Sequence, residues 1–349
     1  MRTITAGEIA TNLNTSRNTV SKVLNSRGYV SEALKKKIVI EAVEKGYKNI
    51  SGELMEYYRS LGDTSQRTEL TIVLLASGAE LSPCLMQIIT GISNEFSAMP
   101  HRLIPYFMQP EDEETFTLPE LFSQTEIDGV ITVGVSCPRV ISTIAELPMA
   151  KVYLDLPYGT VFDEKYYKQS VRGDVIMLEN GPEIQRIVEY FVKKKHCASI
   201  GFAGSRSRFL SSGERYEAFR KGLERCGTAF RPELCLFDTE ESSFFYEEEI
   251  ADRLRNMKEL PEAFLCENDR IAYMLSRELK LLFPEKAEKI WISGYDNLPP
   301  AGVSRAALTS VEVNASIVAK KLADQLFWRL EHREFPYETV YLSTKVILK

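Results

Sequence analysis

A short stretch near the N-terminus places side chains that can read DNA bases on one face of a predicted helix. Within residues 16–25 the apolar residues Val20, Val23 and Leu24 recur at spacings of three and four, so they face inward. The outward positions carry the side chains of Arg17, Asn18, Ser21 and Lys22. Arginine pairs with guanine, asparagine pairs with adenine, and serine and lysine reach base edges or phosphates. The pattern therefore predicts a helix that enters the major groove.

Three short helices are predicted to position this face. The first runs over residues 5–13, the second begins after Ser16, and the third begins after Ser31 and stops at Gly46. We expect Leu34, Ile38 and Val43 to form the inner face of the third helix. Two helices joined by a turn of three or four residues form a helix-turn-helix. A small solvated three-helix bundle without a ligand would show the same periodicity.

Charge is distributed unevenly along the 349 residues. Residues 1–50 carry nine Lys/Arg against four Asp/Glu, a net charge of +5, whereas the whole chain has a net charge of −6. A basic head on an acidic body is typical of a nucleic-acid-binding module joined to a part that does not touch DNA. We therefore expect double-stranded DNA as a partner of the head.

The head is similar to the DNA-binding headpiece of the lactose-repressor/galactose-repressor family. The segments that carry this resemblance are 4–10, 16–25 with its core Thr-Val-Ser-Lys-Val-Leu-Asn, 29–31 and 46–47. The resemblance implies that Arg17, Asn18 and Lys22 read bases. It also implies that a second set of residues supports contact with the DNA backbone, namely Ser16, Thr19, Ser21, Asn25 and Tyr29.

The segment that follows the head departs from the family pattern. The family continues with Pro-Asn and Ala-Arg-x-Leu, and its leucine enters the minor groove. Residues 48–55 of this chain contain no proline and have Gly52 and Glu53 instead. Met55, or Leu54, is the apolar side chain that could serve as a wedge. Because Gly52 weakens a helix, the hinge-helix role stays open.

The rest of the chain is predicted to be an α/β core. Residues 49–68 are polar and indicate a linker that is partly helical, between a headpiece at 1–48 and a body at 69–349. In the body, short apolar runs alternate with amphipathic helices, which favours parallel sheets covered by helices. The expected strands are 71–77, 102–107, 129–135, 150–154, 199–203, 263–266, 289–293, 309–313 and 339–348. The expected helices include 83–96, 182–194 and 318–330.

Catalytic, metal and membrane signatures are missing from the sequence. His101, His196 and His332 have no nucleophile motif beside them, and the six cysteines lack metal-ligand spacing, so we expect neither an enzyme nor a metal or other cofactor. The cysteines are expected to be reduced thiols. No apolar run approaches the ~20 residues that span a bilayer, and no secretory signal is recognised, so we expect a cytoplasmic protein without a membrane partner.

The body resembles the two-lobed, periplasmic-binding-protein-like core of the same repressor family. The segments that carry the resemblance, in family order, are 195–202, 212–219, 261–269 and 292–297. It implies that Arg215, Asn268 and Asp296 bind an effector in the cleft, with Ser77 and Asp155 contributed by the other lobe. Such side chains suit sugar hydroxyls, and Phe244 or Phe245 could stack on a sugar ring.

Other roles for these cleft residues stay open. Asp296 could cap a turn, Arg215 could pair with Glu214 or Glu217, and the phenylalanines could be core residues. The family resemblance predicts a homodimeric repressor with a small sugar-like effector, whose binding changes the affinity for a two-fold operator. A cytosolic sugar receptor whose head no longer binds DNA is the main alternative. An enzyme fused to a DNA-binding head is a third.

Overall fold

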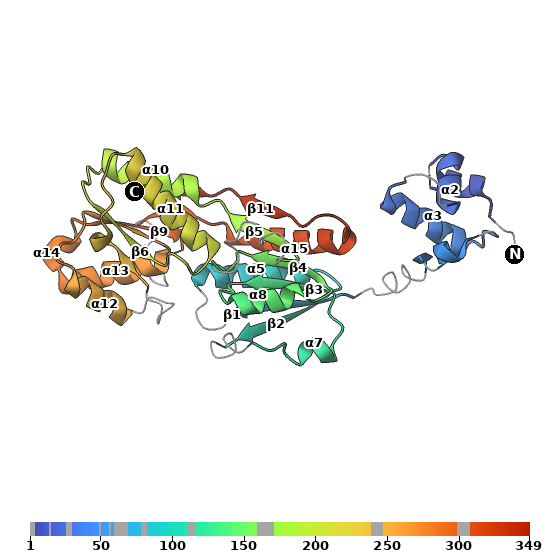
Figure 1. Cartoon of the computed structure of the whole chain (residues 1–349), viewed down its shortest axis with the longest axis horizontal. Coiled ribbons are helices and arrows are strands. Elements are labelled where there is room, and N and C mark those ends of the chain that lie inside the picture. The colour runs from blue at the N-terminus through green and yellow to red at the C-terminus, as the bar shows by residue number, and fades with distance from the viewer. Residues whose placement is uncertain are drawn as a thin grey trace. The chain divides into compact units, whose positions relative to one another are not determined.

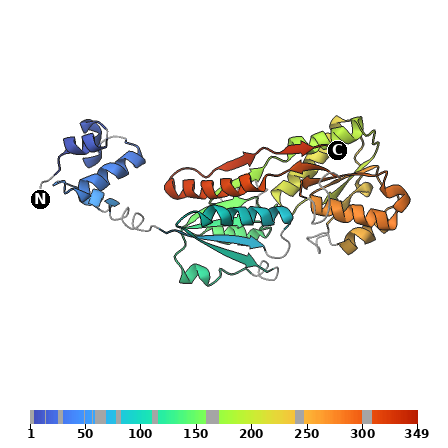
Figure 2. The ribbon, with the colours of Figure 1, turned by 180° about the vertical axis from the view of Figure 1, so that it is seen from behind.

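A computed structural model describes residues 4–13, 15–25, 30–48, 50–55, 57–58, 69–77, 82–109, 116–158, 171–238, 247–298 and 308–349. The chain forms two compact units, Met1–Leu70 and Thr71–Lys349, which are taken separately below (Figures 1 and 2). Tyr29 and Phe244, both predicted as binding residues, lie outside the described residues, as do residues 59–68 of the predicted linker.

The first unit is built on three helices, α1 (Ala6–Asn12), α2 (Arg17–Leu24) and α3 (Glu32–Glu44). Thr5 and Glu8 form a capping box on α1, and Ser16 caps α2 by accepting from the Thr19 amide at 3.0 Å. Ser31 is the N-cap residue of α3, as predicted, but its side chain makes no capping hydrogen bond. Its backbone carbonyl instead accepts from the amides of residues 34 and 35.

The apolar faces of these helices meet in one core. Ile9, Val20 and Ile38 are fully buried at its centre. Val23 and Leu24 are buried as predicted, whereas Leu34 and Val43 of α3 are only partly buried and pack at its margin. The outer face of α2 is thereby left exposed to solvent.

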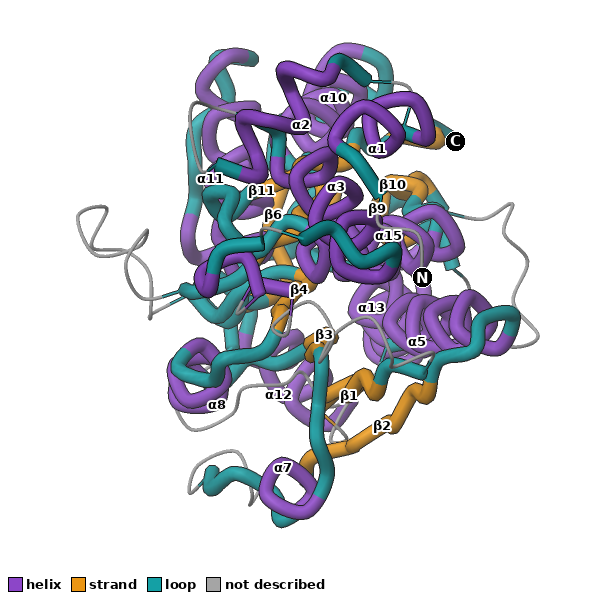
Figure 3. The backbone as a smooth tube through the Cα atoms, turned by 90° about the vertical axis from the view of Figure 1, so that its right-hand side faces the viewer, coloured by secondary structure: helices purple, strands orange, loops and turns teal. Residues whose placement is uncertain are grey.

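The second unit contains two lobes, each with a six-stranded sheet. The sheet of lobe 1 is parallel throughout, in the order β11-β5-β4-β3-β1-β2. Its strands are β1 (Thr71–Ser77), β2 (Arg102–Met108), β3 (Gly129–Val133), β4 (Ala150–Leu154), β5 (Asp174–Leu178) and β11 (Thr339–Leu342). Figure 3 shows α8 (Pro138–Ala145) on one side of these strands, and α5 (Pro83–Ser97) and α15 (Ala315–Glu331) on the other. A short helix, α7 (Leu121–Gln124), precedes β3.

The sheet of lobe 2 has the order β12-β10-β9-β8-β6-β7, and only β12 runs antiparallel to its neighbour. Its strands are β6 (Ile200–Gly204), β7 (Leu236–Phe237), β8 (Ala263–Cys266), β9 (Trp291–Asp296), β10 (Thr309–Glu312) and β12 (Lys345–Ile347). Its helices are α10 (Gly181–Lys193), α11 (Leu210–Arg225), a 3-10 turn (Pro232–Leu234), α12 (Glu247–Asn256), α13 (Asp269–Leu282) and α14 (Pro284–Ala287). Helices α12 and α13 pack against one face of this sheet through a shared buried core. The predicted α/β class is confirmed.

The chain passes between the lobes three times, after β5, after β10 and after β11. The predicted C-terminal strand 339–348 is therefore wrong as a single element, because β11 pairs with β5 in lobe 1 and β12 pairs with β10 in lobe 2. The structure also adds β5 and β7, which the sequence did not predict.

A fully buried ion pair fixes the last return of the chain to lobe 1. The Arg329 guanidinium lies 2.6 Å from the Asp174 carboxylate, and the two side chains are 3% and 0% exposed. Arg329 also donates to the carbonyls of His332, Phe335 and Pro336, just before β11. Because every polar group is satisfied, the pair can be buried without a large penalty.

We predict that Arg329→Met lowers the free energy of unfolding by about 3–5 kcal/mol, because the Asp174 carboxylate is left buried without its cation. Chemical denaturation monitored by circular dichroism measures this change. Arg333→Met removes an exposed arginine four residues further along the chain and should change stability by less than about 0.5 kcal/mol. Equal effects of the two variants would contradict the importance of the buried pair.

Candidate functional site

The outward face of α2 presents the predicted base-reading side chains together. Arg17, Asn18 and Lys22 are exposed and make no hydrogen bond or ion pair among the described residues. The supporting residues hold one another instead. Ser16 and Thr19 share a hydrogen bond of 2.8 Å between their hydroxyls. Asn25 donates to the Ser21 carbonyl at 2.8 Å and to its hydroxyl at 3.2 Å, which closes the end of the helix.

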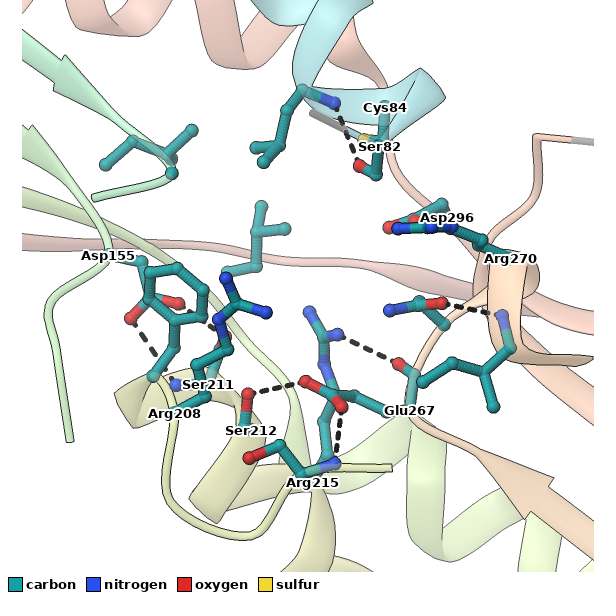
Figure 4. Close-up of a pocket in the computed structure, with 18 of the residues that line it drawn as sticks. Ser82, Cys84, Asp155, Arg208, Ser211, Ser212, Arg215, Glu267, Arg270 and Asp296 are labelled. Carbon is teal, nitrogen blue, oxygen red and sulfur yellow. Dashed lines mark hydrogen bonds between the residues drawn. The ribbon is translucent and has the colours of Figure 1, made fainter. Parts of the chain in front are cut away.

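A cavity of about 180 Å³ lies between the two lobes of the second unit (Figure 4). It sits at the carboxyl ends of the parallel strands, where ligands commonly bind in α/β proteins. Eight strands each contribute a residue at or just after their ends, in order Ser77, Gly134, Asp155, Leu178, Ser205, Asp238, Glu267 and Asp296. The five described residues predicted for effector binding all line this cavity, namely Ser77, Asp155, Arg215, Asn268 and Asp296.

Asp155 joins the two lobes beside the cavity. It follows β4 with a positive φ of 61°, and its carboxylate accepts from the Ser211 hydroxyl and, at 3.4 Å, from the Ser211 amide. Ser211 lies in the first turn of α11, whose amide dipoles favour a negative charge. Next to it, the Leu210 amide donates to the Leu156 carbonyl at 2.8 Å. Lobe 1 is thus hydrogen-bonded to lobe 2 at this side of the cavity.

Arg215 forms the floor of the cavity from α11. Its side chain is buried, its Nε donates to Asn180 Oδ1 and its Nη1 donates to the Glu267 carbonyl, both at 2.9 Å. The guanidinium also lies 3.6 Å from the centre of the Tyr295 ring, within the range of a cation–π interaction. The alternative that Arg215 pairs with Glu214 or Glu217 does not occur in this structure, where Glu214 accepts from Asn180.

Glu267 is a cavity residue that the sequence did not predict. Its carboxylate accepts from the Ser205 amide and from the Ser212 hydroxyl, each at 2.6 Å. Gly204 makes this approach possible, since a Cβ there would lie 2.3 Å from the Glu267 Cβ. The position of Glu267 directly after β8 was the available signal, because the other strand ends also carry polar residues.

Asn268 and Asp269 follow Glu267 and stabilise the chain beside the cavity. Asn268 caps α13 by accepting from the Ile271 amide at 3.0 Å, and its amide nitrogen has no partner among the described residues. Asp269 is buried and holds the loop after β9, because it accepts from the Leu298 amide and the Ser310 hydroxyl, both at 2.7 Å. Asp296, at the end of β9, is therefore fixed in position by a buried neighbour.

Burial disfavours the charged forms of the cavity carboxyls. It raises the pKa of Asp296 to about 7, against the lowering effect of the nearby Arg215 cation, while Asp269 raises it further. Burial also raises the pKa of Asp155 to about 6, although the hydrogen bonds from Ser211 and the Leu156 amide act in the opposite direction. Both groups consequently change protonation near neutral pH.

Further side chains complete the walls of the cavity. Ser82, Cys84, Leu85 and Ile88 come from the start of α5, and Arg208, Phe209, Arg270, Ile271 and Met274 come from lobe 2. Asp155, Asp238, Glu267 and Asp296 thus face three arginines, Arg208, Arg215 and Arg270.

Within the described part of the chain, no group of His, Cys, Asp or Glu side chains could hold a metal ion. No described helix combines the length and hydropathy needed to cross a membrane.

The raised pKa of Asp296 predicts a pH dependence of stability. An aspartate titrates near 3.8 in its ordinary state and near 7 at this site, so between these values the folded protein retains a proton that the unfolded chain loses. The free energy of unfolding should therefore fall as pH rises from about 4 to 7, and Asp296→Asn should flatten that slope. Urea denaturation at several pH values measures it, with Asp324→Asn on exposed α15 surface as the matched control.

Several known proteins are similar to this chain along much of its length. The model of the periplasmic binding protein-like domain family matches residues 188–349. The NTD biosynthesis operon regulator NtdR of Bacillus subtilis (strain 168) is 22% identical over 312 residues, covering 88% of this chain and 87% of the relative. The transcriptional repressor PurR of Haemophilus influenzae (strain PittGG) is 21% identical over 353 residues, covering 99% and 97%.

Solved structures share the fold along the whole chain. The regulator CelR in complex with cellobiose superposes with a TM-score of 0.64 at 16% identity, covering 99% of this chain and 98% of that one. The lac repressor dimer bound to operator and an anti-inducer gives a TM-score of 0.62 at 16% identity, with the same coverage. These relatives are transcription regulators and not enzymes. The chain accordingly resembles transcription regulators of the lactose-repressor/galactose-repressor family along nearly its whole length.

Proposed function

We propose that this protein is an effector-responsive repressor that binds a two-fold DNA operator as a dimer. The observation that carries the proposal is the cavity between the lobes, where Ser77 and Asp155 of lobe 1 meet Arg215, Asn268 and Asp296 of lobe 2. A ligand that contacts both lobes favours one arrangement of them over another. Such a preference is what an allosteric signal to a separate DNA-binding unit requires.

The chemistry of the cavity favours a small sugar-like effector. Carboxylates and the Asn268 amide suit vicinal hydroxyls, while Phe209 and Ile271 offer apolar surface to the face of a sugar ring. A volume of about 180 Å³ lies below the range of roughly 300–1,000 Å³ that is typical of drug-sized ligands. CelR was solved with the sugar cellobiose, which supports the same class of ligand here.

DNA binding is proposed to use the exposed face of α2 from two copies of the chain. Arg17, Asn18 and Lys22 are exposed and supported by a hydrogen-bonded helix end. One helix reads few base pairs, so a palindromic site contacted by a dimer is the expected solution. The lac repressor neighbour was solved as a dimer on its operator, which supports the same arrangement here. Because the proposed partner is DNA, we propose a cytoplasmic location.

We predict that Arg17→Ala/Lys22→Ala weakens binding to a duplex selected by the protein from a random-sequence pool by at least about tenfold, because base and phosphate contacts are lost. A gel-shift titration at fixed salt measures this. Lys320→Ala/Arg333→Ala removes two exposed positive charges from the second unit and should leave affinity unchanged. If wild-type protein selects no duplex, the alternative of a receptor with a non-binding head is favoured.

A thermal-shift screen with neutral sugars and sugar phosphates tests the effector proposal. A ligand bound by the native state at about 100 times its Kd stabilises the protein by roughly 2.7 kcal/mol and raises the Tm. Asp296→Ala should abolish the shift, whereas Asp324→Ala on α15 should retain it. If no carbohydrate shifts the Tm, the proposal of a sugar-like effector is contradicted. The proposal of DNA binding would then still be supported if the same protein binds a selected duplex.

A further inference from the structure

The segment that follows the three headpiece helices is folded onto the headpiece itself. Residues 52–55 and 57–58 are helical, although Gly52 weakens a helix and the proline typical of the family is missing. Ser51 begins this turn by accepting from the Leu54 amide at 3.3 Å with its hydroxyl, and its carbonyl accepts from the Met55 amide at 3.0 Å. The turn is therefore capped from within the segment.

Its inner face belongs to the headpiece core. Leu54 is 3% exposed and lies in the same buried cluster as Ile9, Val20 and Ile38. Ile50, Tyr57 and Tyr58 are partly buried and pack against that cluster. Leu54 and Tyr57 are spaced by three residues, which places them on one face of the helical turn, and Ile50 packs just before that turn begins.

The outer face and a cation–π contact agree with this packing. Ser51, Gly52 and Glu53 are exposed, whereas the Lys35 ammonium of α3 lies 4.4 Å from the centre of the Tyr57 ring. Met55 is half-buried and is not part of the packed cluster. Polar and apolar positions thus alternate as expected for a helix that covers a core from outside.

This arrangement is poorly suited to insertion into DNA. A minor-groove wedge must offer an apolar side chain to a base step, and Leu54 would have to leave the core to do so. Withdrawing a buried leucine leaves a cavity and exposes apolar surface. Met55 is the remaining apolar candidate, but Glu53 lies two residues before it and Glu56 follows it in the sequence, and both carry the charge of the phosphates.

We propose that residues 50–58 form a fourth packing element of the DNA-binding unit that is folded without DNA, and that this segment inserts no side chain between base pairs. Recognition then uses the major-groove face of α2, and the operator is not kinked by an inserted side chain. The part concerning DNA rests on the DNA binding proposed above, whereas the folding of the segment does not.

Hydrogen exchange of the full chain without DNA tests the folded segment. We expect the amides of Leu54 and Met55 to be protected in the free protein. Leu54→Ala should reduce this protection by more than about tenfold, because a core leucine is truncated. Gly52→Ala should increase protection by roughly fivefold, since a Cβ at Gly52 meets nothing within 4 Å and alanine favours a helix. Met55→Ala is the matched control and should leave protection unchanged.

Free exchange of these amides in the DNA-free protein, with protection only after a selected duplex is added, would overturn the proposal. A second measurement addresses the DNA itself, using a duplex selected from a random-sequence pool and a circular-permutation gel assay. We expect no bend attributable to a wedge, and equal complexes with wild type and Met55→Ala. A kink of about 20–90° that is lost in Met55→Ala would show insertion. Failure to select any duplex refutes DNA binding while the exchange result still decides the folding of the segment.

Discussion

A single buried guanidinium holds together the floor of the cleft. Arg215 needs partners because a buried cation without them is costly, and it takes them from Asn180, the Glu267 backbone and the Tyr295 ring. Asn180 lies where the chain first crosses between the lobes, and the other two lie at the ends of β8 and β9. The requirements of one side chain therefore fix a crossing segment and two strand ends in the same place.

Burial disfavours the charged forms of the carboxyls around this cation. Asp155 and Asp296 lie on opposite lobes, and burial raises the pKa of each towards neutrality. Asp155 is anchored by the first turn of α11, while Asp296 depends on a loop that the buried Asp269 secures. A ligand that donates hydrogen bonds to these groups would stabilise their charged forms. The burial that raises these pKa values is thus what such a ligand would offset.

In both units, the burial of apolar side chains decides where the polar side chains lie. In the headpiece, burying one face of α2 leaves the opposite face, with its arginine, asparagine and lysine, exposed to solvent. The segment at 50–58 adds Leu54 to the small core, which a unit of this size needs for stability. In the second unit, both faces of each sheet are covered, so polar groups gather where the strands end.

Local patterns of apolar residues in the sequence determined much of the secondary structure of this protein. Periodicity was sufficient for the inner and outer faces of α2, because burial of one helix face leaves a period in the residue order. Short continuous apolar runs were sufficient for strands such as 71–77 and 150–154, which are buried on both faces, and for the α/β class. The family resemblance supplied Arg215, Asn268 and Asp296 as cavity residues. The tertiary structure alone decided that β11 and β12 belong to different sheets, that Glu267 lines the cavity, and that Leu54 is a core residue. These features depend on contacts between residues distant in the chain, and such contacts have no period that the sequence can display.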